Sequence, residues 1–191
     1  MPGRLGRWTV AVALLVAGCA TAHQQPSTPA PSGGVADQAD IWFMQHMVPH
    51  LWQTISITSL TQDRITHPAL ARLAATVTSR GQADIDQLQG WLAVRGLAPH
   101  VHSHQRVDSR NQTDLERLSQ LRGTAFDLAF LHVVAARHRA GIDLAAAEVD
   151  KGSLPDARRL ARRLLVEQRA QLRQIDTWEH AWSSPSGTAG H

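Results

Sequence analysis

The stretch Pro68-Ala-Leu-Ala-Arg-Leu-Ala74 returns 87 residues later as Pro155-Asp-Ala-Arg-Arg-Leu-Ala161. The same shift aligns about fifty positions without a gap, which is the pattern of a duplicated structural unit. Identical residues at matched positions are Asp40 and Asp127, Phe43 and Phe130, Ile55 and Ile142, Asp63 and Asp150, Ala83 and Ala170, Gln87 and Gln174, and Trp91 and Trp178. Because such a unit buries its apolar face against its copy, we expect any binding site where the two copies face each other.

Each copy has the pattern of two amphipathic helices. Apolar residues of the first helix recur at every fourth position, at Phe43, Met47, Leu51 and Ile55. The long helices predicted in this way cover residues 37–63, 68–94, 124–150 and 155–182. Short turns make the two helices of each copy antiparallel, and two hairpins that cannot bury their apolar stripes alone pack together. The prediction is an all-α four-helix bundle over residues 37–182, with copies at about 37–95 and 124–182 and one longer crossover.

Polar side chains mark the expected helix starts. Thr66 and Ser153 precede the prolines of the second and fourth long helices and are expected to cap them, and Thr124 is expected to cap the third. Within the crossover, residues 96–112 form a connector. Thr113 and Glu116 then have the spacing of a capping box, which predicts that a short helix starts there and ends near Gly123.

The first 19 residues have the pattern of a targeting signal. Arg4 and Arg7 precede a short apolar run, and the segment Val16-Ala-Gly-Cys19 resembles a bacterial lipobox. Cys19 is the single cysteine of the chain, so we expect it to carry lipid and to anchor the protein to the membrane at the cell envelope, outside the cytoplasm. An ordinary cleaved signal with an incidental cysteine is the alternative. Residues 20–36 are expected to be a flexible tether, and residues 183–191 a short tail.

The charge balance gives no sign of a nucleic-acid partner. Two of the 19 basic residues belong to the signal segment, which leaves 17 basic residues against 16 acidic ones. A cluster of arginines at helical spacing, Arg158, Arg159, Arg162 and Arg163, is more typical of a solvated helix face than of a binding patch.

One motif begins the first helix of each copy. The first copy has Asp40-Ile-Trp-Phe43 followed by Met47 and His50-Leu, and the second has Asp127-Leu-Ala-Phe130 followed by Val134 and Arg137-His138. The pattern resembles domain-of-unknown-function family 305, a ferritin-like family of secreted proteins and lipoproteins, over roughly residues 37–182. The resemblance implies a ferritin-like bundle. Some members of that family are associated with copper binding, so it also implies copper as the cofactor.

The motif is incomplete in this chain. The family's paired histidines are reduced to His50 in one copy and His138 in the other, and the methionine remains only as Met47. Helices 37–63 and 124–150 could pool what is left into one hybrid metal site, formed by His50, His138, Asp40, Asp127 and Met47. His46 lies one turn before His50, and histidines at this spacing can bind one metal ion. The alternatives are helix-dipole roles for the aspartates, a hydrogen-bonded core role for His138, and a solvated or interfacial pair of His46 and His50.

Alternating histidines in the connector form a second candidate metal site. His100, His102 and His104 would point to the same side of an extended segment, where imidazoles can bind copper(II), zinc or nickel. The alternative is a polar loop without metal. We expect these three residues to contribute more to copper binding than the bundle, because the repeats lack a complete ligand set.

The usual catalytic motifs are missing from the sequence. No glutamate begins the Glu-x-x-His motif of di-iron bundles, and no glycine-rich phosphate loop or nucleophile elbow occurs. The sequence favours a protein that is not an enzyme, a lipid-anchored bundle that binds or buffers a transition metal weakly, copper first. The alternative is a metal-free structural or interaction lipoprotein whose site has decayed, and a redox enzyme is a more remote one.

Overall fold

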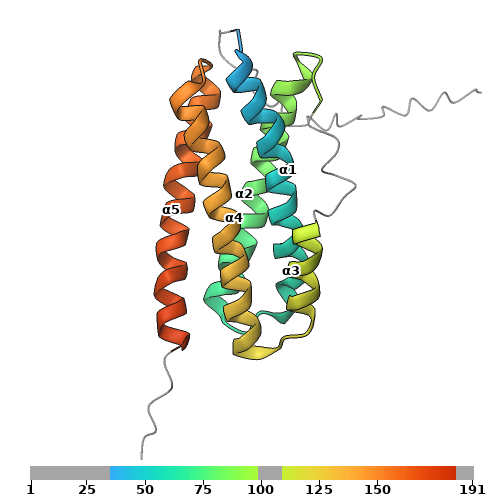
Figure 1. The fold of residues 1–191 in the computed structure, drawn as a ribbon, viewed down its shortest axis with the longest axis vertical. Coiled ribbons are helices and arrows are strands. Elements are labelled where there is room, and N and C mark those ends of the chain that lie inside the picture. The colour runs from blue at the N-terminus through green and yellow to red at the C-terminus, as the bar shows by residue number, and fades with distance from the viewer. Residues whose placement is uncertain (1–34, 99–108, 184–191) are drawn as a thin grey trace, which may run out of the picture.

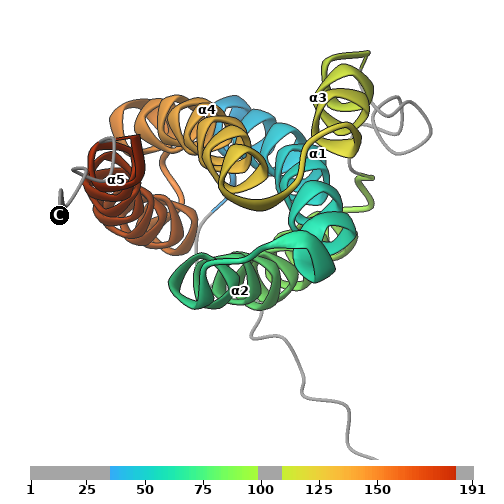
Figure 2. The ribbon, with the colours of Figure 1, turned by 90° about the horizontal axis from the view of Figure 1, so that it is seen from below.

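The computed structural model describes residues 35–98 and 109–183. The first hairpin is formed by α1 (Gln38–Thr61), the short 3-10 helix η1 (Gln62–Arg64) and α2 (Pro68–Ala93). The second hairpin is formed by α4 (Gly123–Lys151) and α5 (Pro155–Ser183), with α3 (Ser109–Ser119) before it. The long helices lie side by side (Figure 1), and seen from below they form a ring, with α3 outside it beside α1 and α4 (Figure 2). The predicted all-α four-helix bundle is confirmed, and the ends of the long helices fall within a residue or two of the expected ones.

The apolar stripes of the four long helices form two core clusters rather than one. The first core cluster includes Phe43, Met44, Met47, Leu51, Ile85, Leu88, Trp91 and Leu160. The second core cluster includes Leu70, Phe126, Phe130, Leu131, Val134 and Ile175. Helices pack most extensively within each hairpin, and the contact of α1 with α4 joins the two hairpins. Burial of these apolar side chains is the main favourable contribution to folding.

The two repeated aspartates tie the hairpins together. Asp127 on α4 is fully buried and accepts hydrogen bonds from the backbone N–H of Thr66 (3.1 Å) and of His67 (3.0 Å), just before α2. At the opposite end of the bundle, Asp40 on α1 is also fully buried. It accepts hydrogen bonds from the backbone N–H of Ser153 (3.1 Å) and of Leu154 (2.9 Å), just before α5. Each aspartate therefore caps the second helix of the other copy.

This arrangement corrects several expected caps. The N-cap of α2 is His67 rather than Thr66, and the side chain of that residue does not cap the helix. The hydroxyl groups of Thr66 and Ser153 donate to Asp127 (2.5 Å) and Asp40 (2.9 Å) respectively. The predicted cap at Thr124 is wrong, since α4 begins one residue earlier and Arg122 is its N-terminal boundary. The capping box at Thr113 is also wrong. The helix α3 starts four residues before it, and Glu116 accepts a bond from Gln112 within the helix.

The turn between α4 and α5 encloses a buried acid. Glu148 is 1% exposed, its carboxyl group lies against that of Asp40, and no donor from a described residue reaches either of its carboxyl oxygens. A β-carbon on Gly152 would come within 2.3 Å of Glu148 Oε1, so any larger residue there would displace the Glu148 carboxyl group. Burial, together with Asp40, raises the pKa of Glu148 to about 8. Glu148 is therefore mostly a neutral carboxylic acid at pH 7.

Candidate metal site

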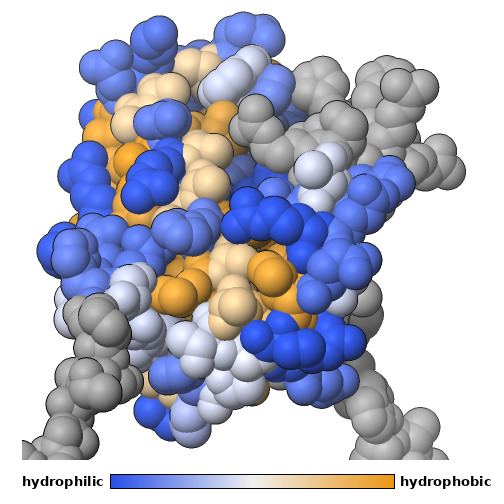
Figure 3. All heavy atoms as spheres, turned by 60° about the horizontal axis from the view of Figure 1, so that its bottom comes forward, coloured by the Kyte–Doolittle hydropathy of each residue, from blue (hydrophilic) through white to orange (hydrophobic). Residues whose placement is uncertain are grey.

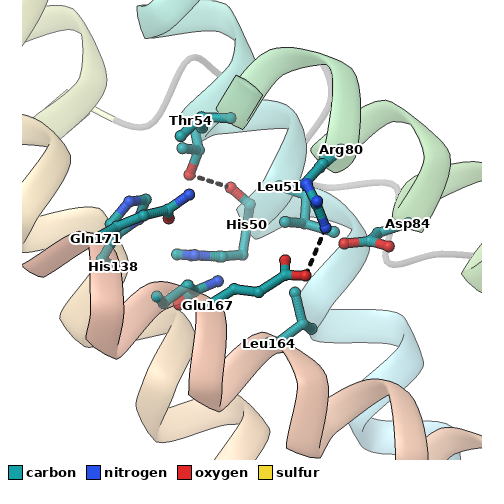
Figure 4. Close-up of a pocket in the computed structure, with 12 residues that line it drawn as sticks. His50, Leu51, Thr54, Arg80, Asp84, His138, Leu164, Glu167 and Gln171 are labelled. Carbon is teal, nitrogen blue, oxygen red and sulfur yellow. Dashed lines mark hydrogen bonds and ion pairs between the residues drawn. The ribbon is translucent and has the colours of Figure 1, made fainter. Parts of the chain in front are cut away.

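A pocket lies in the middle of the bundle, where polar side chains of all four long helices meet (Figure 4). It has a volume of about 40 Å³, enough for a water molecule or a metal ion. The residues that line it are His50, Leu51, Thr54, Val77, Arg80, Gly81, Asp84, His138, Leu164, Glu167, Gln168 and Gln171. A polar pocket in an otherwise apolar bundle core is the usual place for a ligand in this kind of fold.

The two surviving histidines of the repeated motif share this pocket. His50 comes from α1 and is partly buried, and His138 comes from α4 and is 3% exposed. Burial lowers the pKa of His138 to about 4. Burial, followed by the positive charge of Arg137 and by His138, lowers the pKa of His50 to about 4 as well. Both imidazoles are therefore neutral at pH 7, which is the form that can bind a metal ion.

The second copy cannot form an equivalent pocket, because its residue at the His50 position points elsewhere. That residue is Arg137, which is 8% exposed and donates hydrogen bonds to Asn111 and to Asp114 Oδ2 (3.2 Å) of α3. The arginine thus attaches α3 to α4. Each copy contributes one histidine to a single shared pocket. The alternative, two symmetric pockets with two histidines each, does not occur among the described residues.

Two buried polar atoms in the pocket lack a hydrogen-bond partner among the described residues. They are Nε2 of His138 and Oε1 of Gln168, whose side chain is on α5 and 7% exposed. A buried polar atom without a partner costs free energy comparable to a lost hydrogen bond. Because both atoms can donate a lone pair, a bound cation or a water molecule would satisfy them.

Ion pairs between α2 and α5 lie beside the pocket. Arg80 Nη1 is 2.6 Å from Glu167 Oε1, and Arg163 Nη2 is 2.5 Å from Asp84 Oδ1 (the first pair is dashed in Figure 4). Arg80 and Glu167 occupy the same position in the two copies. Burial raises the pKa of Asp84, and the hydrogen bond from Arg163 partly offsets this effect.

The other residues predicted for the bundle site lie elsewhere. Asp40 and Asp127 are at opposite ends of the bundle, where they act as the helix caps described above. Met47 is fully buried in the first core cluster. His46 stacks on Trp42, with ring centroids 4.2 Å apart, and its Nδ1 is 2.7 Å from the carbonyl oxygen of Trp42. The pooled five-residue site is thus divided among separate places, and only His50 and His138 meet.

Some predicted sites fall outside the described residues. They are the lipidation site Cys19 and the loop histidines His100, His102 and His104, so the predictions for them stay predictions. Within residues 35–98 and 109–183, no three side chains of histidine, cysteine, aspartate or glutamate are grouped so that they could hold a metal ion.

Sequence reasoning missed Gln168 and Gly141, which help to form the pocket. A β-carbon on Gly141 would come within 2.5 Å of Gln168 Oε1 and 2.9 Å of His50 Nε2, so the glycine makes room for both side chains. A difference between the two copies could have pointed to these residues. The residue type differs at two matched pairs of positions, 54 with 141 and 81 with 168.

Comparison with known proteins agrees with the repeat and the bundle. The family model described as a domain of unknown function (DUF305) matches residues 40–179. The chain belongs to the DUF305 family. No curated protein matches the chain. The match spans both copies and thus all four long helices of the bundle, whereas the ferritin-like character that the resemblance implied stays a prediction.

Solved structures share the fold of this DUF305 protein. A DUF305 protein from Streptomyces coelicolor, named as a candidate secreted protein, is 21% identical, with a TM-score of 0.67 over 80% of this chain and 98% of that one. CopM in its Cu(II)-bound form is 19% identical, with a TM-score of 0.66 over 75% of this chain and 97% of that one. CopM in its Cu(I)-bound form is 21% identical, with a TM-score of 0.65 over 76% of this chain and 98% of that one. At these identities, the likeness establishes the fold alone.

None of the helices in the described part of the chain is long and apolar enough to cross a bilayer. On the face shown in Figure 3, apolar side chains lie in patches among hydrophilic ones.

Proposed function

We propose that this protein binds a transition metal ion weakly in the pocket between His50 and His138, with copper as the first candidate. One observation carries the proposal: His138, whose buried Nε2 has no hydrogen-bond partner among the described residues, lines the same small cavity as a second neutral histidine. Imidazole is a common ligand of copper, zinc and nickel. Two histidines are fewer than the ligands of a tight site, so the proposed role is weak binding or buffering.

The fold gives this proposal independent support. CopM has the same fold and has been crystallised with Cu(II) and with Cu(I). The connector histidines His100, His102 and His104 are a second proposed place for copper, which the sequence favours and which needs no packed helices. A site in the bundle exists only when α1 and α4 are packed, so metal bound there stabilises the folded state.

We therefore expect copper(II) to raise the midpoint of chemical unfolding. A free concentration 100 times the dissociation constant adds about 2.7 kcal/mol to the free energy of unfolding. Replacing both His50 and His138 by Ala should remove this stabilisation. Replacing His100, His102 and His104 by Ala should keep it while lowering the number of bound ions. The measurements are denaturant titrations with and without Cu(II), and calorimetric titrations of the same proteins.

The opposite results have a clear meaning. Stabilisation that survives in the His50 and His138 double variant would place the metal outside the pocket. If the unmutated chain binds no copper at all, the alternative is favoured, namely a metal-free structural or interaction lipoprotein. In its favour, no three histidine, cysteine, aspartate or glutamate side chains of the described residues are grouped so that they could hold a metal ion.

We also propose that the protein is held at the outer face of a membrane by lipid on Cys19. The support is the sequence Val16-Ala-Gly-Cys19 directly after an apolar run. Cys19→Ala should abolish acylation and leave the protein unprocessed or released, as seen by mass spectrometry and by fractionation of cells. Equal membrane retention and an identical mature mass in this variant would contradict the proposal.

A further inference from the structure

Two pairs of matched positions have diverged together in the two copies. In the first copy, Thr54 on α1 accompanies Gly81 on α2, whereas in the second copy Gly141 on α4 accompanies Gln168 on α5. Each pair joins one residue on the first helix of a hairpin to one on its second helix. The small residue is on the second helix in one copy and on the first helix in the other, so the duplication has become asymmetric in mid-bundle.

This exchange places different side chains against the two glycines. Beside Gly81, the space is filled by Ile55, whose side-chain carbons lie 3.1 and 3.2 Å from the position of an added β-carbon. Beside Gly141, the space is filled by polar atoms instead. The amide of Gln168 (2.5 and 2.9 Å) and Nε2 of His50 (2.9 Å) both reach the position of an added β-carbon. Gly141 thus lets Gln168 and His50 meet inside the pocket that His138 also lines.

We propose that the amide oxygen of Gln168 is a third metal ligand beside His50 and His138, and that this donor set makes the pocket selective for Cu(II) over Cu(I). The inference rests on the proposed function and adds a residue and an oxidation state to it. It stands on a side chain that is 7% exposed, lines the cavity, and has an oxygen without a partner among the described residues.

The donor atoms explain the selectivity. Cu(I) prefers soft thioether and thiolate ligands, whereas imidazole nitrogens and amide oxygens suit Cu(II) and other borderline or hard divalent ions. None of the residues lining the pocket contains sulfur. The two methionines of α1, Met44 and Met47, are fully buried in the first core cluster, among apolar side chains.

The test uses the full chain with His100, His102 and His104 replaced by Ala, so that only the bundle can bind copper. Cu(II) affinity is measured by competition with a chelator of known affinity, and Cu(I) affinity in the same way under reducing conditions. We expect tighter binding of Cu(II) than of Cu(I). We also expect Gln168→Leu to lower Cu(II) affinity by at least about tenfold, since even outer-shell partners of a metal ligand contribute that much. Cu(I) affinity should change little.

Two further variants control for folding and for the general effect of the substitution. Gln174→Leu removes an exposed amide from the same helix, two turns away, and should leave both affinities unchanged. Gln168→Glu keeps an oxygen at the same place and should bind Cu(II) at least as tightly as the parent chain without the loop histidines, which covers the case that the leucine variant does not fold.

Each outcome has one meaning. If Gln168→Leu binds Cu(II) as tightly as Gln174→Leu does, or if folded Gln168→Glu binds it more weakly than the parent chain, Gln168 is not a ligand, and the inference fails while the proposed function stands. A preference for Cu(I) in the parent chain overturns the selectivity. If the parent chain binds neither ion, the proposed function itself fails and the inference falls with it.

Discussion

Asp127→Ala is expected to lower the free energy of unfolding by roughly 2–3 kcal/mol, because hydrogen bonds to a charged group contribute about 1.5–3 kcal/mol to stability. The carboxylate of Asp127 is fully buried and accepts bonds from the backbone N–H and hydroxyl of Thr66 and from the backbone N–H of His67. Its second oxygen also lies 2.8 Å from Nδ1 of His67. Alanine would remove the acceptor of these donors at the start of α2, where Thr66 is exposed and His67 half-buried, so water replaces only part of the lost hydrogen bonding.

The measurement is urea unfolding followed by circular dichroism, with amide hydrogen exchange at Thr66 and His67 as a local readout. Asp143→Ala is the matched control, because Asp143 is on the same helix but exposed, and surface substitutions usually change stability by less than about 0.5 kcal/mol. Asp40→Ala should have an effect like that of Asp127→Ala, since Asp40 makes the equivalent contacts at Ser153 and Leu154. A loss below about 1 kcal/mol in both aspartate variants would show that the cross-caps do not hold the hairpins together.

Glu148→Gln is expected to remove a pH dependence of stability that spans pH 4.5 to 8. The pKa of Glu148 is raised from 4.5 to about 8 in the folded protein. Between these values the folded state holds a proton that the unfolded state has lost, so stability falls as pH rises. The full loss is reached above pH 8. Each pKa unit corresponds to about 1.4 kcal/mol, and we expect roughly 3 kcal/mol because Glu148 and Asp40 share the effect.

The hydrogen-bond geometry around Asp40 explains why the proton stays on Glu148. Burial by itself raises the pKa of Asp40, but hydrogen bonds from the N–H groups of Leu154 and Asp37 and from the hydroxyl of Ser153 outweigh it and hold the pKa below its usual value. Asp40 therefore remains a carboxylate over this pH range. Glutamine at position 148 keeps the size and can still donate to Asp40, but it cannot ionise.

The measurement compares the free energies of unfolding of the two proteins from pH 5 to 9. The difference between them isolates Glu148, because His50 and His138 titrate in both. Their lowered pKa values, about 4, make both proteins lose stability as pH falls from about 6.5 towards 4. If the two proteins respond to pH identically between 5 and 9, Glu148 is already ionised in the folded state and the prediction is wrong.

The amino-acid sequence alone was sufficient for the fold. Hydrophobic periodicity of 3.6 residues, prolines at Pro68 and Pro155 and one duplication are local or repeated features, so they determined the four long helices and their pairing into hairpins. The helix caps could not be predicted in this way. Thr66 and Ser153 have the residue types of caps, but the acceptors that bind the helix starts come from more than fifty residues away, at Asp127 and Asp40.

The candidate site depended still more on tertiary structure. The sequence indicated that His50 and His138 were the remainder of a repeated motif, and the packing of α1 against α4 brought them to one pocket. The side chains of Asp40, Asp127 and Met47 are also of types that can bind a metal ion. In the structure, however, the two aspartates cap helices and the methionine is buried in the core. No sequence motif identifies Gln168 and Gly141 as part of a metal site, because their role depends on the space between α4 and α5. The repeat determined the helices, whose periodicity is local, and only their packing decided which polar side chains share a cavity.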